Sequence, residues 1–197
     1  MTCSKFISAL TLLFIFQINT LTAQKNFTVG GVSVPRTLEF KNKEIQLNGV
    51  GQRSKMFTEL YVQALYLSQL SQDAKFILES NTEMAIRIQV TSSMVTSKKL
   101  SKALEKGLEK SVGVEGITKL NKQIAQLEAL LTKEETNEGD AFNLMYSPVD
   151  SAISIYKNGN YEGKIEGFEF KKAFFGIWLS ENPVDKTLKE DLLGIYK

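Results

Sequence analysis

The sequence of 197 residues contains no histidine and a single cysteine, Cys3, close to its beginning. Without histidine the chain cannot form a Ser-His or Cys-His catalytic pair, and it lacks the commonest general base and zinc ligand. One cysteine alone forms neither an intrachain disulfide nor a cysteine metal site. We therefore expect no metal and no cofactor. Any chemistry must come from arginine, lysine, tyrosine, a carboxylate or bound water.

Neither sign of charge is in excess: the chain has 24 Lys and Arg residues and 22 Asp and Glu residues. Nucleic-acid-binding domains usually carry a basic patch or stripe, so this balance argues against a nucleic-acid partner. Lysines are concentrated in residues 98–110, where glutamates lie among them. This stretch is most simply a solvated helix face, and weak contact with an anionic membrane surface is the second interpretation.

The first 23 residues have the pattern of a cleaved secretory signal peptide. A positive charge comes first, residues 8–16 form a short apolar run, and the small residue Ala23 precedes the expected cleavage site. The run is too short for a convincing transmembrane helix, although an uncleaved N-terminal anchor is the alternative. We expect cleavage near Ala23, a periplasmic or secreted location, and one mature domain over residues 24–197.

Hydrophobic periodicity divides the rest of the chain into strands, a helical pair, more strands and a final group of helices. Apolar side chains alternate in the strand segments and recur at helical spacing in the middle and at the end. The expected strands are residues 32–40, 44–53, 57–67, 84–90, 142–146, 152–156 and 161–165, and the expected helices are 71–79, 97–112, 117–131, 170–178 and 186–193. This order predicts an α+β fold in which helices cover one face of an antiparallel sheet.

Arg53 is notable because it ends a predicted strand that contains two glycines. Side chains alternate along a strand, so the glycines and the arginine should share one face. The full set on that face would be Ile45, Leu47, Gly49, Gly51 and Arg53. Glycine weakens a strand and often marks a bulge or a place where another group approaches the backbone closely. A guanidinium there can hold a carboxylate or an enolate-like oxygen, whereas the simpler interpretation is a surface arginine at a hairpin tip.

Tyr61 is the candidate partner of Arg53 on the following strand. A three-residue turn would bring both side chains to one face across the two glycines, with Phe57 directly opposite Arg53. A two-residue turn would shift this pairing, and the sequence leaves the register open. Arg53 could equally form an ion pair with Glu59, which would contribute little stability if exposed.

Three blocks of sequence follow one another in a characteristic order: Val32–Pro35, then Gly49–Arg53 with Leu60–Leu67, then Phe170–Ser180 with Pro183 and Asp185. Together they resemble the chalcone isomerase-like family over nearly the whole mature chain. The resemblance implies an open-faced β-sandwich of the chalcone isomerase type, an antiparallel sheet with a helical layer and a cleft between them. It also implies that the side chain of Arg53 points into that cleft.

The family includes plant chalcone isomerases, plant plastid fatty-acid-binding proteins and bacterial secreted proteins without established activity. The arginine at the place of Arg53 assists ring closure in the isomerases, and in the fatty-acid binders it holds the carboxylate with the help of a tyrosine. Tyr61 stands where the binders have that tyrosine and the isomerases a threonine. The isomerases also have a tyrosine early in the next helix, where this chain has Leu100. The resemblance thus favours non-catalytic binding of a fatty acid or another small apolar acid.

The binding hypothesis also predicts what surrounds such a ligand. A buried carboxylate needs partners, which the arginine and the phenol would supply, and the tail needs apolar side chains. We expect the tail to contact Leu65, Leu67, Phe57 and aromatic side chains of residues 170–178.

Two other functions stay open. An intramolecular lyase of the chalcone isomerase type, with Arg53 as its catalytic residue, needs neither histidine nor cysteine, because such a reaction depends mainly on electrostatic stabilisation. A structural or partner-binding module with a vestigial cleft would instead use the lysine-rich surface at Lys98, Lys102 and Lys106.

Overall fold

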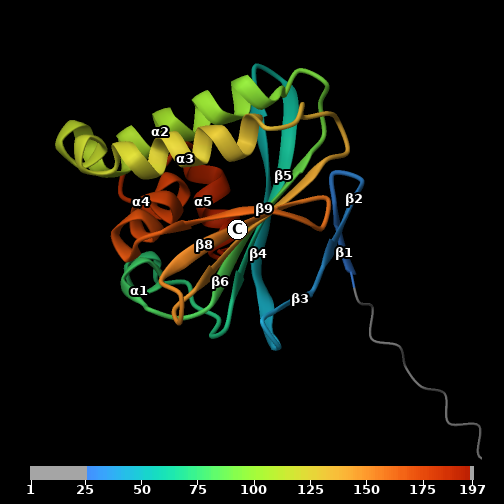
Figure 1. Ribbon diagram of the computed structural model, residues 1–197. Coiled ribbons are helices and arrows are strands. Elements are labelled where there is room, and N and C mark those ends of the chain that lie inside the picture. The colour runs from blue at the N-terminus through green and yellow to red at the C-terminus, as the bar shows by residue number, and fades with distance from the viewer. Residues whose placement is uncertain (1–25, 196–197) are drawn as a thin grey trace, which may run out of the picture.

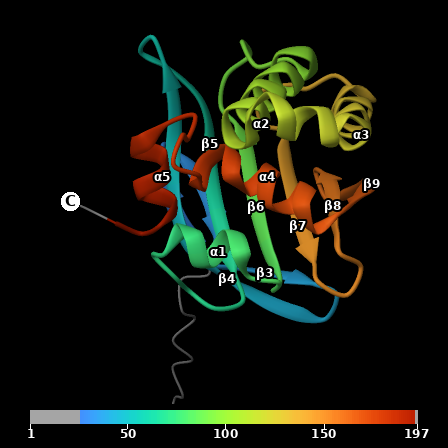
Figure 2. The same cartoon turned by 90° about the vertical axis from the view of Figure 1, so that its left-hand side faces the viewer.

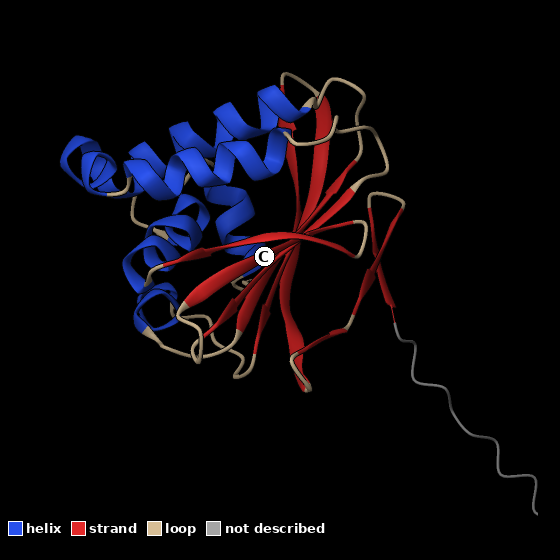
Figure 3. Cartoon of the chain, viewed as in Figure 1, coloured by secondary structure: helices blue, strands red, loops and turns tan. Residues whose placement is uncertain are grey.

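The computed structural model describes residues 26–195, so the expected signal peptide lies outside the described residues. A seven-stranded antiparallel sheet has helices on one face and a separate two-stranded hairpin on the other (Figures 1 and 3). The predicted α+β arrangement, an antiparallel sheet with a helical layer, is confirmed. Within these residues, none of the helices combines the length and the apolar character needed to cross a membrane.

The large sheet is a meander in which each strand pairs with the next strand along the chain. Its strands, in spatial order, are β3 (Thr37–Phe40), β4 (Lys43–Lys55), β5 (Thr58–Leu67), β6 (Met84–Val90), β7 (Ala141–Ser147), β8 (Ala152–Lys157) and β9 (Asn160–Glu166). The single strand expected over residues 32–40 is divided, because β2 (Val32–Pro35) pairs with β1 (Asn26–Val29) in a separate hairpin. Proline cannot donate to a ladder, and Pro35 is accordingly the last residue of β2.

The helices lie together on one side of the sheet (Figure 2). They are α1 (Ala74–Glu79), α2 (Ser97–Lys119), α3 (Asn121–Thr132), α4 (Phe168–Leu179) and α5 (Lys186–Leu192). The expected helical pair corresponds to α2 and α3, but α2 continues past Gly113, where φ is 72° and the helix is kinked. Ile117 therefore belongs to the end of α2 and not to the second helix of the pair.

Both faces of the sheet are buried, and they belong to two separate apolar clusters. The larger cluster, between sheet and helices, includes Leu65, Leu67, Ile86, Ile88, Leu100, Phe174 and Trp178. The smaller cluster lies on the side of the β1–β2 hairpin and includes Val34, Ile45, Val50, Val62 and Tyr66. Because β5 contributes alternate residues to both clusters, it is an almost continuous apolar run in the sequence.

A β-bulge at Asn48 exchanges the two faces of β4. The residues on either side of it pair with consecutive residues of β5, so Asn48 has no cross-strand partner of its own. Ile45 and Leu47 consequently pack in the smaller cluster, whereas the two glycines and Arg53 face the helices. The prediction that these five residues share one face was wrong, because one extra residue reverses the alternation of side chains.

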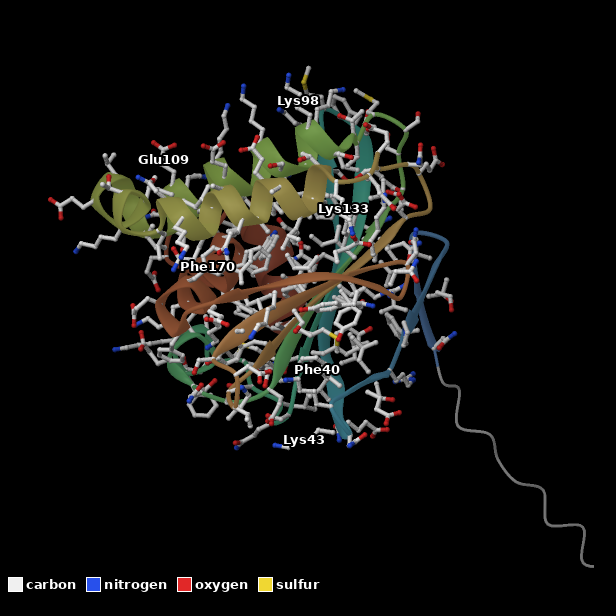
Figure 4. The ribbon with its side chains drawn as sticks, in the orientation of Figure 1. Phe40, Lys43, Lys98, Glu109, Lys133 and Phe170 are labelled. Carbon is white, nitrogen blue, oxygen red and sulfur yellow. The ribbon has the colours of Figure 1, made fainter. Side chains whose placement is uncertain are left out.

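The lysine-rich stretch forms the outer face of α2. Leu100, Leu104 and Leu108 are buried against the core, while Lys98, Lys102 and Lys106 are exposed. Figure 4 shows Lys98 and Glu109 projecting outward from this helix. The arrangement agrees with a solvated face, and contact with a membrane surface stays a prediction.

Lys171 is a lysine buried completely within the helical layer. Its Nζ donates to the carbonyl oxygens of Ile77, Leu78 and Ser80, at 3.1, 2.8 and 2.7 Å, where α1 ends. The last carbonyls of a helix have no partner within the helix and lie at the negative end of its dipole, so an ammonium group suits them. Desolvation lowers the pKa of Lys171 to about 8. This side chain of α4 thus holds the end of α1.

Replacing Lys171 by methionine should lower the free energy of unfolding by about 1–3 kcal/mol, because buried carbonyls lose their donor. Urea denaturation at pH 7 measures this change. Lys172→Met removes a neighbouring lysine whose ion pairs with Glu79 and Glu169 lie at the surface, and it should change stability by less than about 1 kcal/mol. Equal losses in the two variants would contradict the role of Lys171 as a cap.

The same variant should alter the pH dependence of stability. The folded protein holds the Lys171 proton less tightly than the unfolded chain does, since burial lowers the pKa of this group. The unfolded state therefore binds more protons above pH 8, and wild-type stability should rise with pH relative to that of Lys171→Met.

Candidate ligand-binding site

Arg53 and Tyr61 are direct cross-strand partners on β4 and β5. The hairpin turn between the strands consists of two residues, Met56 and Phe57, so the shorter of the two turn lengths left open by the sequence is present. A second bulge, at Leu60, then places Tyr61 instead of Leu60 opposite the arginine. The two candidate residues share the helix-facing side of the sheet because of this bulge.

Phe57 does not line an apolar pocket, and that prediction was wrong. It lies at the hairpin turn, where both its side chain and that of Met56 are exposed. Leu65 and Leu67, by contrast, are buried between sheet and helices as expected. Leu100, at the place where the resemblance puts the tyrosine of the isomerases, is buried in the same apolar cluster.

Helix α5 lies directly on the glycine backbone of β4 (Figure 2). A Cβ atom on Gly49 would stand 2.2 Å from the carbonyl oxygen of Asp191 and 2.4 Å from that of Leu192. A Cβ atom on Gly51 would stand 2.5 Å from Oδ2 of Asp191. The group that approaches the two glycines closely is therefore a helix of the same chain.

Asn48 fixes the end of this helix. Its Nδ2 donates to the carbonyl oxygens of Ser71 and Leu192, both at 2.9 Å, and its Oδ1 accepts from the Ser71 backbone N–H at 2.9 Å. The bulged residue thus ties β4 to the last turn of α5 and to the segment before α1.

The guanidinium of Arg53 holds a carboxylate that belongs to the protein itself. Nη1 donates to Oδ2 of Asp185 at 2.8 Å and to the carbonyl oxygen of Ser54 at 2.6 Å. The side chains of Arg53 and Asp185 are each 23% exposed. Oδ1 of Asp185 accepts from the backbone N–H of Leu188 at 3.1 Å, which makes Asp185 the N-cap of α5. One carboxylate therefore starts the helix and pairs with the arginine.

Tyr61 and Trp178 lie beside this ion pair. Burial raises the pKa of the Tyr61 phenol, the Asp185 carboxylate raises it further, and the Trp178 indole and Arg53 act in the opposite direction. The phenol is thus protonated at neutral pH and available as a donor. Nε1 of Trp178 is close enough to influence the phenol, yet it makes no hydrogen bond of normal geometry within residues 26–195.

Gln63 is the third polar residue on this side of β5. It is fully buried, it faces the helices like Tyr61, and its cross-strand partner on β4 is Gly51. Neither Nε2 nor Oε1 of its amide has a hydrogen-bond partner in the described part of the chain. Sequence reasoning missed Gln63 as a site residue, although a lone glutamine within the apolar run of β5 is a visible signal, and it expected Trp178 only among the aromatic side chains around the tail.

Two open hollows on the described residues are lined by neither Arg53 nor Tyr61. One of about 520 Å³ borders the β1–β2 turn and includes Val32 and Gln89, and one of about 400 Å³ lies beside Asn48 and Gly194. At the site itself, α5 and packed side chains fill the space between sheet and helices. The described residues contain no group of three or more Cys, Asp or Glu side chains placed to hold a metal ion.

These features define an α+β protein of the open-faced β-sandwich class, with an arginine–tyrosine pair under its last helix. The chalcone isomerase-like family model matches residues 26–194, so the chain belongs to this family. Among solved structures it is similar to a fatty-acid binding protein of Arabidopsis thaliana, with 18% sequence identity and a TM-score of 0.65 over 83% of this chain and 92% of that chain. At this identity the likeness shows a shared fold. Comparison with curated proteins gives no match.

Gly49→Ala should lower the free energy of unfolding by about 1–3 kcal/mol, because its Cβ would overlap backbone atoms of α5 that cannot rotate away. Gly51→Ala is the matched comparison, since the nearest atoms that its Cβ would meet belong to the Asp191 side chain, and it should cost less. Chemical denaturation of both variants measures the difference. A smaller loss for Gly49→Ala than for Gly51→Ala would contradict this account of how α5 packs.

Proposed function

We propose that this protein binds a fatty acid or another small apolar acid without transforming it, and that Arg53 and Tyr61 hold the carboxylate. The observation that carries the proposal is that Arg53 already binds a carboxylate, that of Asp185, beside the buried phenol of Tyr61. Membership of the chalcone isomerase-like family and the fold shared with a fatty-acid binding protein support it. We further propose, from the signal pattern before Gln24, that the protein acts in the periplasm or outside the cell.

The ligand carboxylate would take the place of Asp185 on the guanidinium. Arg53 offers further N–H donors, and a carboxylate with two oxygens can accept from both the arginine and the protonated phenol of Tyr61. Asp185 would keep its hydrogen bond to the backbone of Leu188 and remain the N-cap of α5. The exchange replaces one ion pair by another, so it leaves the partly buried arginine with a counter-charge.

The tail would enter the apolar layer that α5 now closes. Leu65 and Leu67 on β5 and the aromatic side chains of α4 supply the apolar surface. Because this layer is packed, α5 must move away from β4 to admit a chain. The contacts that hold α5 near the site are the Asp185–Arg53 pair and the hydrogen bond of Asn48 to Leu192.

Ring closure of a chalcone is the weaker candidate function. The resemblance places Leu100 where the isomerases have a tyrosine, and this leucine is buried and apolar. It offers no hydrogen-bonding group to a substrate.

The binding proposal is tested by native mass spectrometry of the purified protein and by titration with fatty acids of several chain lengths. Arg53→Gln should weaken binding about tenfold or more, and Tyr61→Phe should weaken it less, because a hydrogen bond to a charged group contributes more than a neutral one. Arg87→Gln is the matched control, since this partly buried arginine of the same sheet bonds Asn143 and Gln89. Absence of binding by the wild type at every chain length would refute the proposal.

Asp185→Asn should strengthen binding several-fold. Asparagine caps a helix about as well as aspartate, so α5 keeps its N-cap while the charge that competes for Arg53 is removed. The free energy of unfolding should change by less than about 1 kcal/mol, since the lost ion pair is partly exposed. Asp191→Asn, which removes a carboxylate of the same helix that is not bonded to Arg53, is the comparison. An affinity unchanged by Asp185→Asn would exclude displacement of Asp185 by the ligand.

A further inference from the structure

Three buried polar atoms beside the Arg53–Tyr61 pair have no hydrogen-bond partner within residues 26–195. They are Nε2 and Oε1 of Gln63 and Nε1 of Trp178, and both side chains are 0% exposed. The great majority of buried polar atoms in folded proteins are paired, because an unpaired one has lost its water without compensation. Nε1 of Trp178 lies close to the phenol oxygen of Tyr61, so it is the two amide atoms of Gln63 that indicate a ligand completing their hydrogen bonds.

Gln63 is close to the carboxylate position and not at the far end of the site. It lies two residues beyond Tyr61 on the same face of β5, a separation of about 7 Å between Cα atoms in a strand. Its neighbour across β4 is Gly51, which has no side chain of its own and is covered by the Asp191 side chain of α5. A group bonded to the Gln63 amide would therefore lie near the acid group of a ligand held by Arg53 and Tyr61.

The carboxylate position and the Gln63 amide need different hydrogen-bonding groups of a ligand. Arg53, Tyr61 and Trp178 offer N–H or O–H donors, which suit a carboxylate because it only accepts hydrogen bonds at neutral pH. Oε1 of Gln63 is an acceptor and can bond only to a donor, which a carboxylate and a hydrocarbon chain both lack. A hydroxyl group donates and accepts, so it can satisfy both atoms of the amide.

We propose that the ligand is a hydroxylated apolar acid, whose carboxylate is held by Arg53 and Tyr61 and whose hydroxyl, on a carbon near the carboxylate, bonds to the amide of Gln63. Trp178 donates its indole N–H to the same head group. This assignment rests on the proposed function and narrows it. A plain fatty acid would place methylene groups against the amide and leave it unpaired, so Gln63 acts as a specificity-determining residue.

The test compares dodecanoic acid with racemic 3-hydroxydodecanoic acid by titration calorimetry. The wild type should bind the hydroxy acid about tenfold more tightly. Gln63→Leu should bind both acids with the affinity that the wild type has for dodecanoic acid, or a higher one. Gln89→Leu is the matched control, because this glutamine of β6 already donates to the Gly139 carbonyl and accepts from Arg87. It should keep the wild-type preference.

Thermal unfolding without ligand provides an independent readout. Gln63→Leu should raise the midpoint of unfolding, because it removes an unpaired buried amide, whereas Gln89→Leu should lower it, because it breaks two hydrogen bonds. If Gln63→Leu lowers the midpoint as much as Gln89→Leu does, the amide is satisfied in the free protein, for example by a buried water, and the proposal is wrong.

The outcomes separate this proposal from the function on which it rests. Equal affinity of the wild type for the two acids would overturn the role of Gln63 and leave fatty-acid binding intact. Failure of the wild type to bind either acid, or any acid of another chain length, would overturn the proposed function together with this assignment.

Discussion

The close contact between α5 and the backbone of β4 is the constraint on which the arrangement of the site depends. Backbone carbonyls of the helix occupy the space that a side chain at Gly49 would need, and the Asp191 side chain occupies the space at Gly51. With the helix in this position, its N-cap Asp185 reaches Arg53 and its body covers the helix-facing side of β4. Because neither glycine has a side chain, α5 can lie close enough for Asp185 to pair with Arg53. The same close packing of α5 keeps the polar groups beside Arg53 away from water.

The helix-facing side of the sheet contains both the apolar core and buried polar groups. An apolar layer of leucines, isoleucines and aromatic side chains stabilises the fold, yet Gln63 and Trp178 lie in it with polar atoms unpaired among the described residues. Lys171 is a buried polar group with a structural role, and its hydrogen bonds are complete, since three carbonyl oxygens accept from its ammonium group. The contrast within one layer supports a binding role for the unpaired groups.

Much of the fold was predictable because the periodic signals are long. The apolar run of β5, the alternation along β6 and the helical spacing in α2 and α4 extend over many residues, so the elements and their order followed from them. The two bulges could not be predicted, because one extra residue, at Asn48 or at Leu60, does not change the hydrophobic periodicity visibly. For the candidate site, Arg53 and Tyr61 were predicted as a pair, but Asp185 is 132 residues away from Arg53 in the chain, and only the folded structure brings those two together.

The bulge at Asn48 also affects how this chain should be compared with distant relatives. Before the bulge the odd-numbered residues Ile45 and Leu47 pack in the smaller cluster, and after it the odd-numbered residues Gly49 and Gly51 face α5. A relative without the extra residue, aligned position by position through this strand, would have its core residues matched to the residues of the candidate site. An alignment with such a relative should therefore place a one-residue insertion at Asn48.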